Sequence, residues 1–139
     1  MQVSTHQLTI QTEGVIDMHD ITGEVQRTVQ QSGCQNGLVT AFVRHTTAAI
    51  MIGEYEPGLI HDMPAYIERL APAGVDYRHN QVNHDDNAHS HLAGSVIGPS
   101  ETIPVVDGRL VLGTWQQIIL IELDTHPRSR EVVIQVVGE

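Results

Sequence analysis

Ionisable side chains are densest between positions 84 and 91, where the sequence HDDNAHSH places five of them in eight positions. If the end of this segment is extended, His89 and His91 project from the same face and can bind one cation. Asp85 or Asp86 could supply a carboxylate ligand, or orient an imidazole by accepting its second ring N–H. The segment therefore predicts a metal site, although a His-rich acidic loop can also be solvated and bind no metal.

A third imidazole must come from elsewhere in the chain, and His45 is the best candidate. It lies in a polar break between two apolar segments and is preceded by Arg44. The hydroxyls of Thr46 and Thr47, which follow it, can bind a substrate oxyanion or a phosphate. The resulting site would have three protein ligands and one position open to water or substrate. An all-imidazole set favours zinc, whereas carboxylate and water ligands favour magnesium or manganese.

Two other polar regions each allow two interpretations. Trp115 is the only tryptophan and stands among polar residues, next to Gln116. Its ring could form the wall of a ligand pocket, or it could fill the core or a subunit interface beside a bulge at Gly113. Arg128 and Arg130 could bind a phosphate bidentately, but arginines near acidic residues at a turn more often form a solvated ion-pair cluster.

The composition excludes several classes of protein. All seven basic residues are arginine, so a Schiff-base lysine and the lysine of a phosphate-binding loop are both impossible. Cys34 is the only cysteine, which excludes an internal disulfide and an all-cysteine metal site within one chain. The net charge of −10 and the scarcity of aromatic residues argue against nucleic acid and anionic membranes as partners.

Length and hydropathy predict one domain, residues 1–139, with a single compact core. The longest apolar runs are far shorter than the roughly 18 residues that a membrane span needs. The first residues, MQVST, lack a basic segment followed by an apolar one. No secretory signal is therefore expected, and the cytoplasm is the predicted location.

Hydrophobic periodicity predicts an α+β fold, a mostly antiparallel two-layer sheet structure with two helices. The first helix is expected to begin at Asp20 or Thr22 and to end near Gly33. The second helix is expected over residues 57–70, where apolar side chains recur on one helical face. A continuous parallel sheet is disfavoured because too few helices alternate with strands.

The remaining segments are predicted to be strands, turns and loops. Asp107-Gly108 predicts a β-hairpin, and residues 71–87 are predicted to form a loop that leads to His89. Strands are expected over residues 3–12, 38–44, 48–52, 103–106, 109–112, 116–123 and 131–137.

The run SETIPVVDGRLVLGTWQ, residues 100–116, resembles the signature of the YjbQ family, the secondary thiamine-phosphate synthase enzymes. Residues 45–50, 54–59 and 86–91 are similar to further blocks of that family, in the same order. The resemblance covers residues 38–139.

This resemblance implies a compact β-sandwich subunit that assembles as a homotrimer, with a weak thiamine-phosphate synthase activity. Such a transferase joins a pyrimidine diphosphate to a thiazole phosphate and expels diphosphate. The chemistry is normally served by a divalent cation and phosphate-binding groups. The expected partner is therefore a phosphorylated small molecule, and the expected cofactor is a divalent metal, zinc or magnesium.

The resemblance also implies roles for individual residues. The implied catalytic residues are His45, His91 and Asp86, and the implied metal ligands are His45 and His91 with either His89 or Asp86. The residues implied to contact or support an anionic substrate are Arg44, Thr46, Thr47, Trp115 and Gln116. His79 and His84 receive no role.

Two alternatives without physiological catalysis remain open, because a fold does not fix a function. The chain could be a trimeric module that binds a metal or a small ligand, with only an incidental synthase activity. It could also be a structural trimer in which a metal occupies a packing position.

Overall fold

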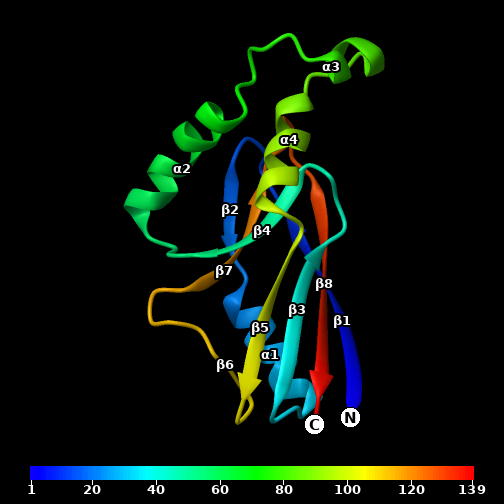
Figure 1. Cartoon of the computed structure of the whole chain (residues 1–139), viewed down its shortest axis with the longest axis vertical. Helices are drawn as coiled ribbons and strands as arrows, with labels where there is room; N and C mark the ends of the chain where they lie inside the picture. Colours follow the sequence, from blue (N-terminus) through cyan, green and yellow to red (C-terminus); the bar gives the residue numbers. More distant parts are fainter.

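A computed structural model describes all 139 residues, which fold into two antiparallel sheets and four helices (Figure 1). The larger sheet has five strands, in the order β1 (Gln2–Gln11), β8 (Ser129–Gly138), β3 (Gly37–Val43), β5 (Ser100–Val106) and β6 (Arg109–Leu110). The smaller sheet has three strands, in the order β2 (Asp17–Asp20), β7 (Gln117–Glu122) and β4 (Ala48–Gly53). The helices are α1 (Thr22–Ser32), α2 (Pro57–Leu70), α3 (Arg78–Asn83) and α4 (Ala88–Ile97).

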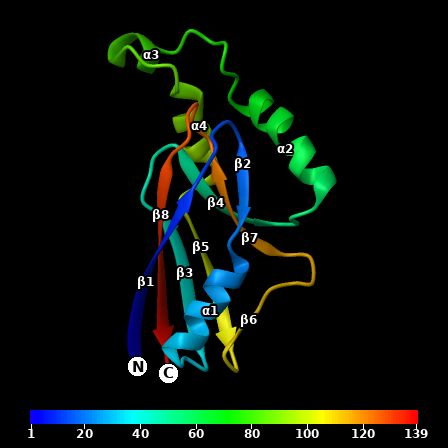
Figure 2. The same cartoon turned by 180° about the vertical axis from the view of Figure 1, so that it is seen from behind.

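Successive side chains along a strand point to opposite faces of the sheet, so the larger sheet has one buried face and one exposed face. In β3, Val39, Ala41 and Val43 are buried, whereas Leu38 and Phe42 are exposed. The buried face is covered by the smaller sheet near one end and by α1 near the end that carries both termini (Figure 2). The two sheets therefore pack around a shared apolar core.

Strand β7 contributes to two separate cores because both faces of the smaller sheet are covered. Ile118 and Leu120 pack with residues of the larger sheet and α1. Ile119 and Ile121 point the other way and pack with Ile67 of α2 and other apolar residues. The helices α2 and α4 thus form a third layer over the smaller sheet. None of the helices is long and apolar enough to cross a membrane.

Most of the expected elements are confirmed. The helix over 57–70 and the seven expected strands are present, with shifts of a few residues at their ends. Helix α1 ends at Gly33, whose φ of 75° is the left-handed conformation that glycine adopts most easily. The hairpin at Asp107-Gly108 joins β5 to β6, and both of its turn residues have positive φ. Strand β2 was not expected, because its sequence DMHD contains one apolar residue.

The expectation of two helices is wrong, because α3 and α4 replace the predicted loop and extended segment before residue 98. Helix α4 packs against β4 through small residues such as Ala93 and Gly94. A Cβ on Gly94 would lie 3.0 Å from the carbonyl oxygen of Thr46. Close packing in the folded chain, which local hydrophobic periodicity does not report, therefore stabilises this helix.

Candidate functional site

A cavity of about 600 Å³ lies among segments that Figure 1 shows at the end of the sheets opposite the termini. It is formed by the loop between β3 and β4, the segment between β7 and β8 with the start of β8, and the N-terminal part of α4 with the residue before it. None of its lining residues is hydrophobic. The lining residues are Arg44, His45, Thr46, Thr47, Asn87, His91, Asp124, Arg128, Ser129 and Arg130. We call this cavity the polar pocket.

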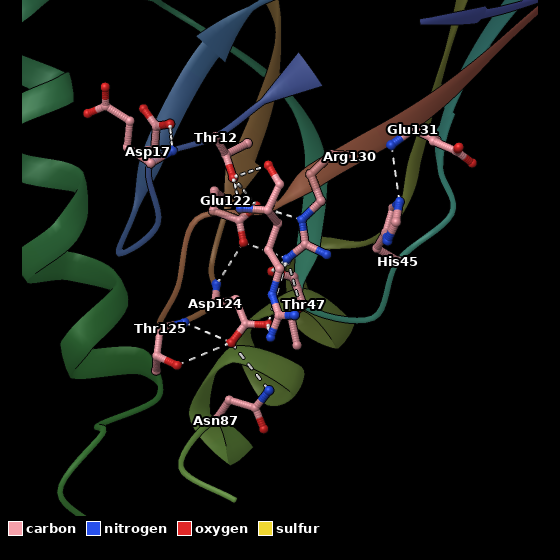
Figure 3. A network of polar contacts seen from close by, with 12 residues as sticks. Thr12, Asp17, His45, Thr47, Asn87, Glu122, Asp124, Thr125, Arg130 and Glu131 are labelled. Atoms are coloured by element: carbon pink, nitrogen blue, oxygen red, sulfur yellow. Dashed lines mark hydrogen bonds and ion pairs between the residues drawn. The ribbon is translucent and has the colours of Figure 1, made fainter. Parts of the chain in front are cut away.

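A buried ion pair between Arg130 of β8 and Glu122 of β7 lies at the base of the polar pocket (Figure 3). The guanidinium also donates to the carbonyl oxygen and to the Oγ1 of Thr47, at 3.1 and 2.7 Å. Thr12 Oγ1 donates to Glu122 at 2.9 Å. Each charged group is therefore hydrogen-bonded, as burial demands.

Asp124 lies beside this ion pair and accepts hydrogen bonds at both of its carboxylate oxygens. Its donors include the hydroxyl of Thr47 at 2.9 Å, the amide of Asn87 at 3.3 Å and the backbone N–H of Thr125 at 2.7 Å. Arg128 Nη2 lies 3.1 Å from the same carboxylate.

Burial alone would raise the pKa of Asp124. The hydrogen bonds to its carboxylate and the positive charge of Arg128 outweigh burial and lower that pKa below its usual value. Asp124 is therefore ionised at neutral pH and holds the surrounding donors in place.

His45 is held by the backbone of β8. The N–H of Glu131 donates to His45 Nε2 at 3.0 Å, so the neutral ring carries its proton on Nδ1. Burial, reinforced by the positive charge of Arg130, lowers the pKa of His45 below the ordinary histidine value. His45 is therefore an uncharged imidazole with a defined tautomer at neutral pH.

His91 projects from α4 into the same pocket. Burial is the main reason that its pKa is lowered, and the neighbouring His79 lowers it further. The ring centroids of His79 and His91 are 4.6 Å apart. The polar pocket thus combines two neutral imidazoles with three arginines, a set that can bind an anion and exchange protons near neutral pH.

The structure brings together seven of the residues singled out in the sequence and separates the others. Those that line the polar pocket are Arg44, His45, Thr46, Thr47, His91, Arg128 and Arg130. Asp86 and His89 line a different cavity, of about 300 Å³, between α2 and the turn before β2. Trp115 and Gln116 lie in the loop between β6 and β7 and do not line the polar pocket.

The expected extended geometry of His89 and His91 is wrong, because both residues belong to α4. Residues two apart in a helix point to different sides, whereas residues three or four apart share a face. His89 Nδ1 is buried without a hydrogen-bond partner, away from the polar pocket. No three His, Cys, Asp or Glu side chains are grouped closely enough to hold a metal ion.

Sequence reasoning missed several residues of the pocket and its base. Glu122 directly follows the apolar run of β7, and a charge in that position indicates a buried, paired carboxylate. Arg130 is buried in an ion pair, so its interpretation as part of a solvated cluster is wrong. Asn87 is expected only as the end of the loop over residues 71–87, Asp124 is given no role, and no local pattern marks the two as partners.

Comparison with known proteins shows similarity over almost the whole chain. Residues 6–139 match the family model described as "UPF0047 protein YjbQ-like". A UPF0047 protein of Methanothermobacter thermautotrophicus is 40% identical over 139 residues, covering 100% of this chain and 95% of that protein.

Two solved structures are also similar to this chain. A YbjQ-like protein of unknown function from Sulfolobus solfataricus has a TM-score of 0.95 and 37% identity, covering 99% of both chains. A hypothetical protein from Aeropyrum pernix has a TM-score of 0.92 and 43% identity, covering 98% of this chain and 99% of that chain.

Proposed function

Because the chain belongs to the YjbQ-like UPF0047 family, we propose that its polar pocket binds the phosphate groups of a small-molecule substrate. The observation that carries the proposal is the lining, which contains three arginines, one carboxylate and no hydrophobic residue. Guanidinium groups match the geometry of phosphate oxygens, and the hydroxyls of Thr46 and Ser129 are further donors. The whole chain carries a net charge of −10, whereas three arginines gather in this pocket. Their positive charge favours the binding of a compact anion at this one place.

The exposed arginines of the pocket are the ones available to a ligand. The side chain of Arg128 is 44% exposed and that of Arg44 is 56% exposed, whereas that of Arg130 is 4% exposed. Arg128 is held by Asp124, which orients its guanidinium toward the pocket lining. In this proposal Arg44 and Arg128 contact the phosphate, and Arg130 supports Thr47 from below.

The reaction we propose is the transfer that joins a pyrimidine diphosphate to a thiazole phosphate. The thiazole nitrogen forms a bond to the methylene carbon of the pyrimidine, and the bond from that carbon to the diphosphate oxygen breaks. The bonding electrons leave with the diphosphate, whose growing charge the arginines stabilise. The Nδ1–H of His45 and the neutral ring of His91 can hydrogen-bond the leaving group. Asp86 takes no direct part, since its contact with the site runs through Thr125 at 3.2 Å.

A divalent metal does not fit the pocket as a preformed three-ligand site. His45 and His91 line the pocket, but His89 lies elsewhere and the oxygens of Asp124 are already engaged. Zinc or magnesium binding stays a prediction, and no step of the proposed transfer depends on it.

A second candidate is a non-catalytic module that binds the same phosphorylated ligand. Glu122 and Asp124 both have their oxygens occupied by hydrogen bonds, so neither is free to act as a general base. Ligand binding without turnover is the result expected from this alternative.

We also propose that the chain forms a homotrimer. In support, several large apolar side chains are exposed on one chain, among them Leu38, Phe42 and Val106 on the larger sheet. Trp115 is 72% exposed, which fits the interpretation that it fills a subunit interface. Light scattering should give a mass about three times the 15.3 kDa of one chain. A mass close to that of one chain would contradict the trimer.

Calorimetric titration with inorganic pyrophosphate tests the proposed phosphate site. Arg128→Gln should weaken binding about tenfold or more, because hydrogen bonds to charged groups contribute about 1.5–3 kcal/mol. Arg27→Gln, which removes an exposed arginine from α1, is the matched control and should bind as the wild type does. If the wild type does not bind pyrophosphate, or both variants weaken it equally, the phosphate site is refuted.

A product assay then separates the transferase from the binding module. The wild type is supplied with the pyrimidine diphosphate and the thiazole phosphate, with and without added magnesium, and product is measured by chromatography. His45→Asn and His91→Asn should each lower turnover by a larger factor than they weaken pyrophosphate binding. Binding without any turnover in the wild type would favour the module.

A further inference from the structure

Helix α3 stands away from both sheets, and none of its residues is buried (Figure 1). His79 is nevertheless held by two hydrogen bonds. Its Nε2 lies 3.2 Å from Asn87 Oδ1, and its Nδ1 lies 3.2 Å from Asn83 Nδ2. The ring also contacts that of His91 with an interplanar angle of 55°. His79 therefore connects α3 to a wall of the polar pocket.

The hydrogen bonds from Asn83 to Asp124 form a chain with one consistent direction. An amide nitrogen can only donate, so Asn83 Nδ2 donates to His79 Nδ1, which is then unprotonated. The proton of the neutral ring is on Nε2, which donates to Asn87 Oδ1. Asn87 Nδ2 in turn donates to Asp124 Oδ1 at 3.3 Å. Reversing the Asn87 amide would direct its oxygen at the Asp124 carboxylate, so this assignment is the favourable one.

We propose that His79 is a positioning residue of the polar pocket, which fixes the ring of His91 by direct contact and fixes Asn87 against Asp124 by hydrogen bonding. The inference rests on the proposed function in one respect, namely that His91 contacts the bound phosphate. It assigns a role to a histidine of α3 that lies outside the polar pocket.

The position of His91 supports this role. His79 contacts its ring from α3, and His91 lines the polar pocket together with His45 and Arg128. A ring held by this contact presents its nitrogens to a phosphorylated ligand in one orientation.

Nitrogen-15 NMR of the histidine rings tests the proposal without requiring a ligand. His79→Phe keeps a ring beside His91 but removes both hydrogen bonds. We expect the ring-nitrogen chemical shifts of His91, and the tautomer populations that they report, to change at a fixed pH. His61→Gln on α2 removes a histidine whose side chain is 89% exposed, and it should leave the His91 signals unchanged.

Pyrophosphate titration of the same variants gives a second readout. His79→Phe should bind pyrophosphate about threefold to tenfold more weakly, as expected when a residue coupled to the binding groups is lost. His79→Gln can still donate to Asn87 and should restore affinity to within about twofold of the wild type, although the His91 ring signals stay changed because the ring contact is lost. His79→Gln also allows the proposal to be tested if His79→Phe does not fold.

The two proposals fail in different ways. If the wild type does not bind pyrophosphate, the phosphate site fails, while the His91 ring signals still measure the effect of His79. If the ring-nitrogen shifts and tautomer populations of His91 are the same in the wild type, His79→Phe and His79→Gln, the positioning role of His79 is refuted.

Discussion

Arg130 and Glu122 form an ion pair that joins the two sheets, with only 4% and 0% of their side chains exposed. Arg130 belongs to β8 of the larger sheet and Glu122 to β7 of the smaller sheet. The same guanidinium hydrogen-bonds Thr47, which lines the polar pocket. The shape of the pocket therefore depends directly on how the sheets pack.

Removing one partner of this ion pair should be strongly destabilising. Arg130→Met leaves Glu122 buried and uncompensated, which we expect to lower the free energy of unfolding by about 3–5 kcal/mol. The double variant Arg130→Met/Glu122→Leu should recover much of that loss, because it also removes the uncompensated carboxylate of Glu122. Urea denaturation measures all three proteins.

Arg44→Met is the matched control for this prediction. Arg44 pairs with Glu131 at 3.4 Å, and their side chains are 56% and 41% exposed. Exposed pairs contribute about 0–1 kcal/mol, so the control should unfold almost as the wild type does. A double variant less stable than Arg130→Met would contradict our account of the buried pair.

Stability should fall as the pH is lowered from about 7.5 to 5.5. The pKa values of His45 and His91 are lowered in the folded state, so the unfolded state binds more protons in this range. The stability associated with the two neutral rings is complete above the unfolded histidine pKa of about 6.5 and is lost as pH falls through the folded values.

The variant His45→Gln/His91→Gln should show a flatter dependence of melting temperature on pH over that range. His61→Gln serves as the control, since its ring is almost fully exposed. Asp124 adds a further loss at lower pH, because its lowered pKa contributes stability above about pH 4 that disappears as its carboxylate is protonated. Equal pH slopes for the double variant and the wild type would be inconsistent with this prediction.

Thr47 should be sensitive to the loss of its hydroxyl, which donates to Asp124 and accepts from Arg130. Thr47→Val keeps the shape of the side chain but removes one hydrogen-bond partner each from the buried Asp124 and Arg130. We expect the free energy of unfolding to fall by about 1–3 kcal/mol. Pyrophosphate binding should weaken as well. Thr47→Ser should restore both properties, since it restores the hydroxyl.

Thr40→Val provides the comparison for Thr47→Val. Thr40 lies on β3, and its hydroxyl pairs with that of Thr102 on the exposed face of the larger sheet. The same substitution there should change stability by less than about 0.5 kcal/mol. Similar losses at both positions, measured by urea denaturation, would argue against a special role for Thr47.

Metal binding should depend on a bound phosphate. Only two imidazoles, His45 and His91, are available in the pocket, so a divalent ion would need phosphate oxygens and water to complete its ligands. Mass spectrometry of the purified protein should therefore find more zinc or magnesium after incubation with the metal and pyrophosphate than with the metal alone. In His45→Ala/His91→Ala this increase should be absent. Stoichiometric metal retained by that double variant would exclude these histidines as ligands.

Elements with local signals can be predicted from the sequence alone. Alternation of apolar residues predicted the strands, Asp107-Gly108 predicted the hairpin, and the helix over 57–70 follows from its apolar face. The segment from Arg44 to Thr47 is a polar break between apolar strands in the sequence, and it lines the polar pocket in the structure. Its role in binding stays a prediction.

Which distant residues meet depends on how the elements pack in the folded chain. Helix α4 depends on packing against β4, and its geometry separates His89 from His91. Arg130 pairs with Glu122 across two sheets, and Asn87 reaches Asp124 from a different element. The periodicity of a sequence reports which face of each element is buried, but not which element covers it. The partners of a buried charge are set by that packing, so they became known only with the fold.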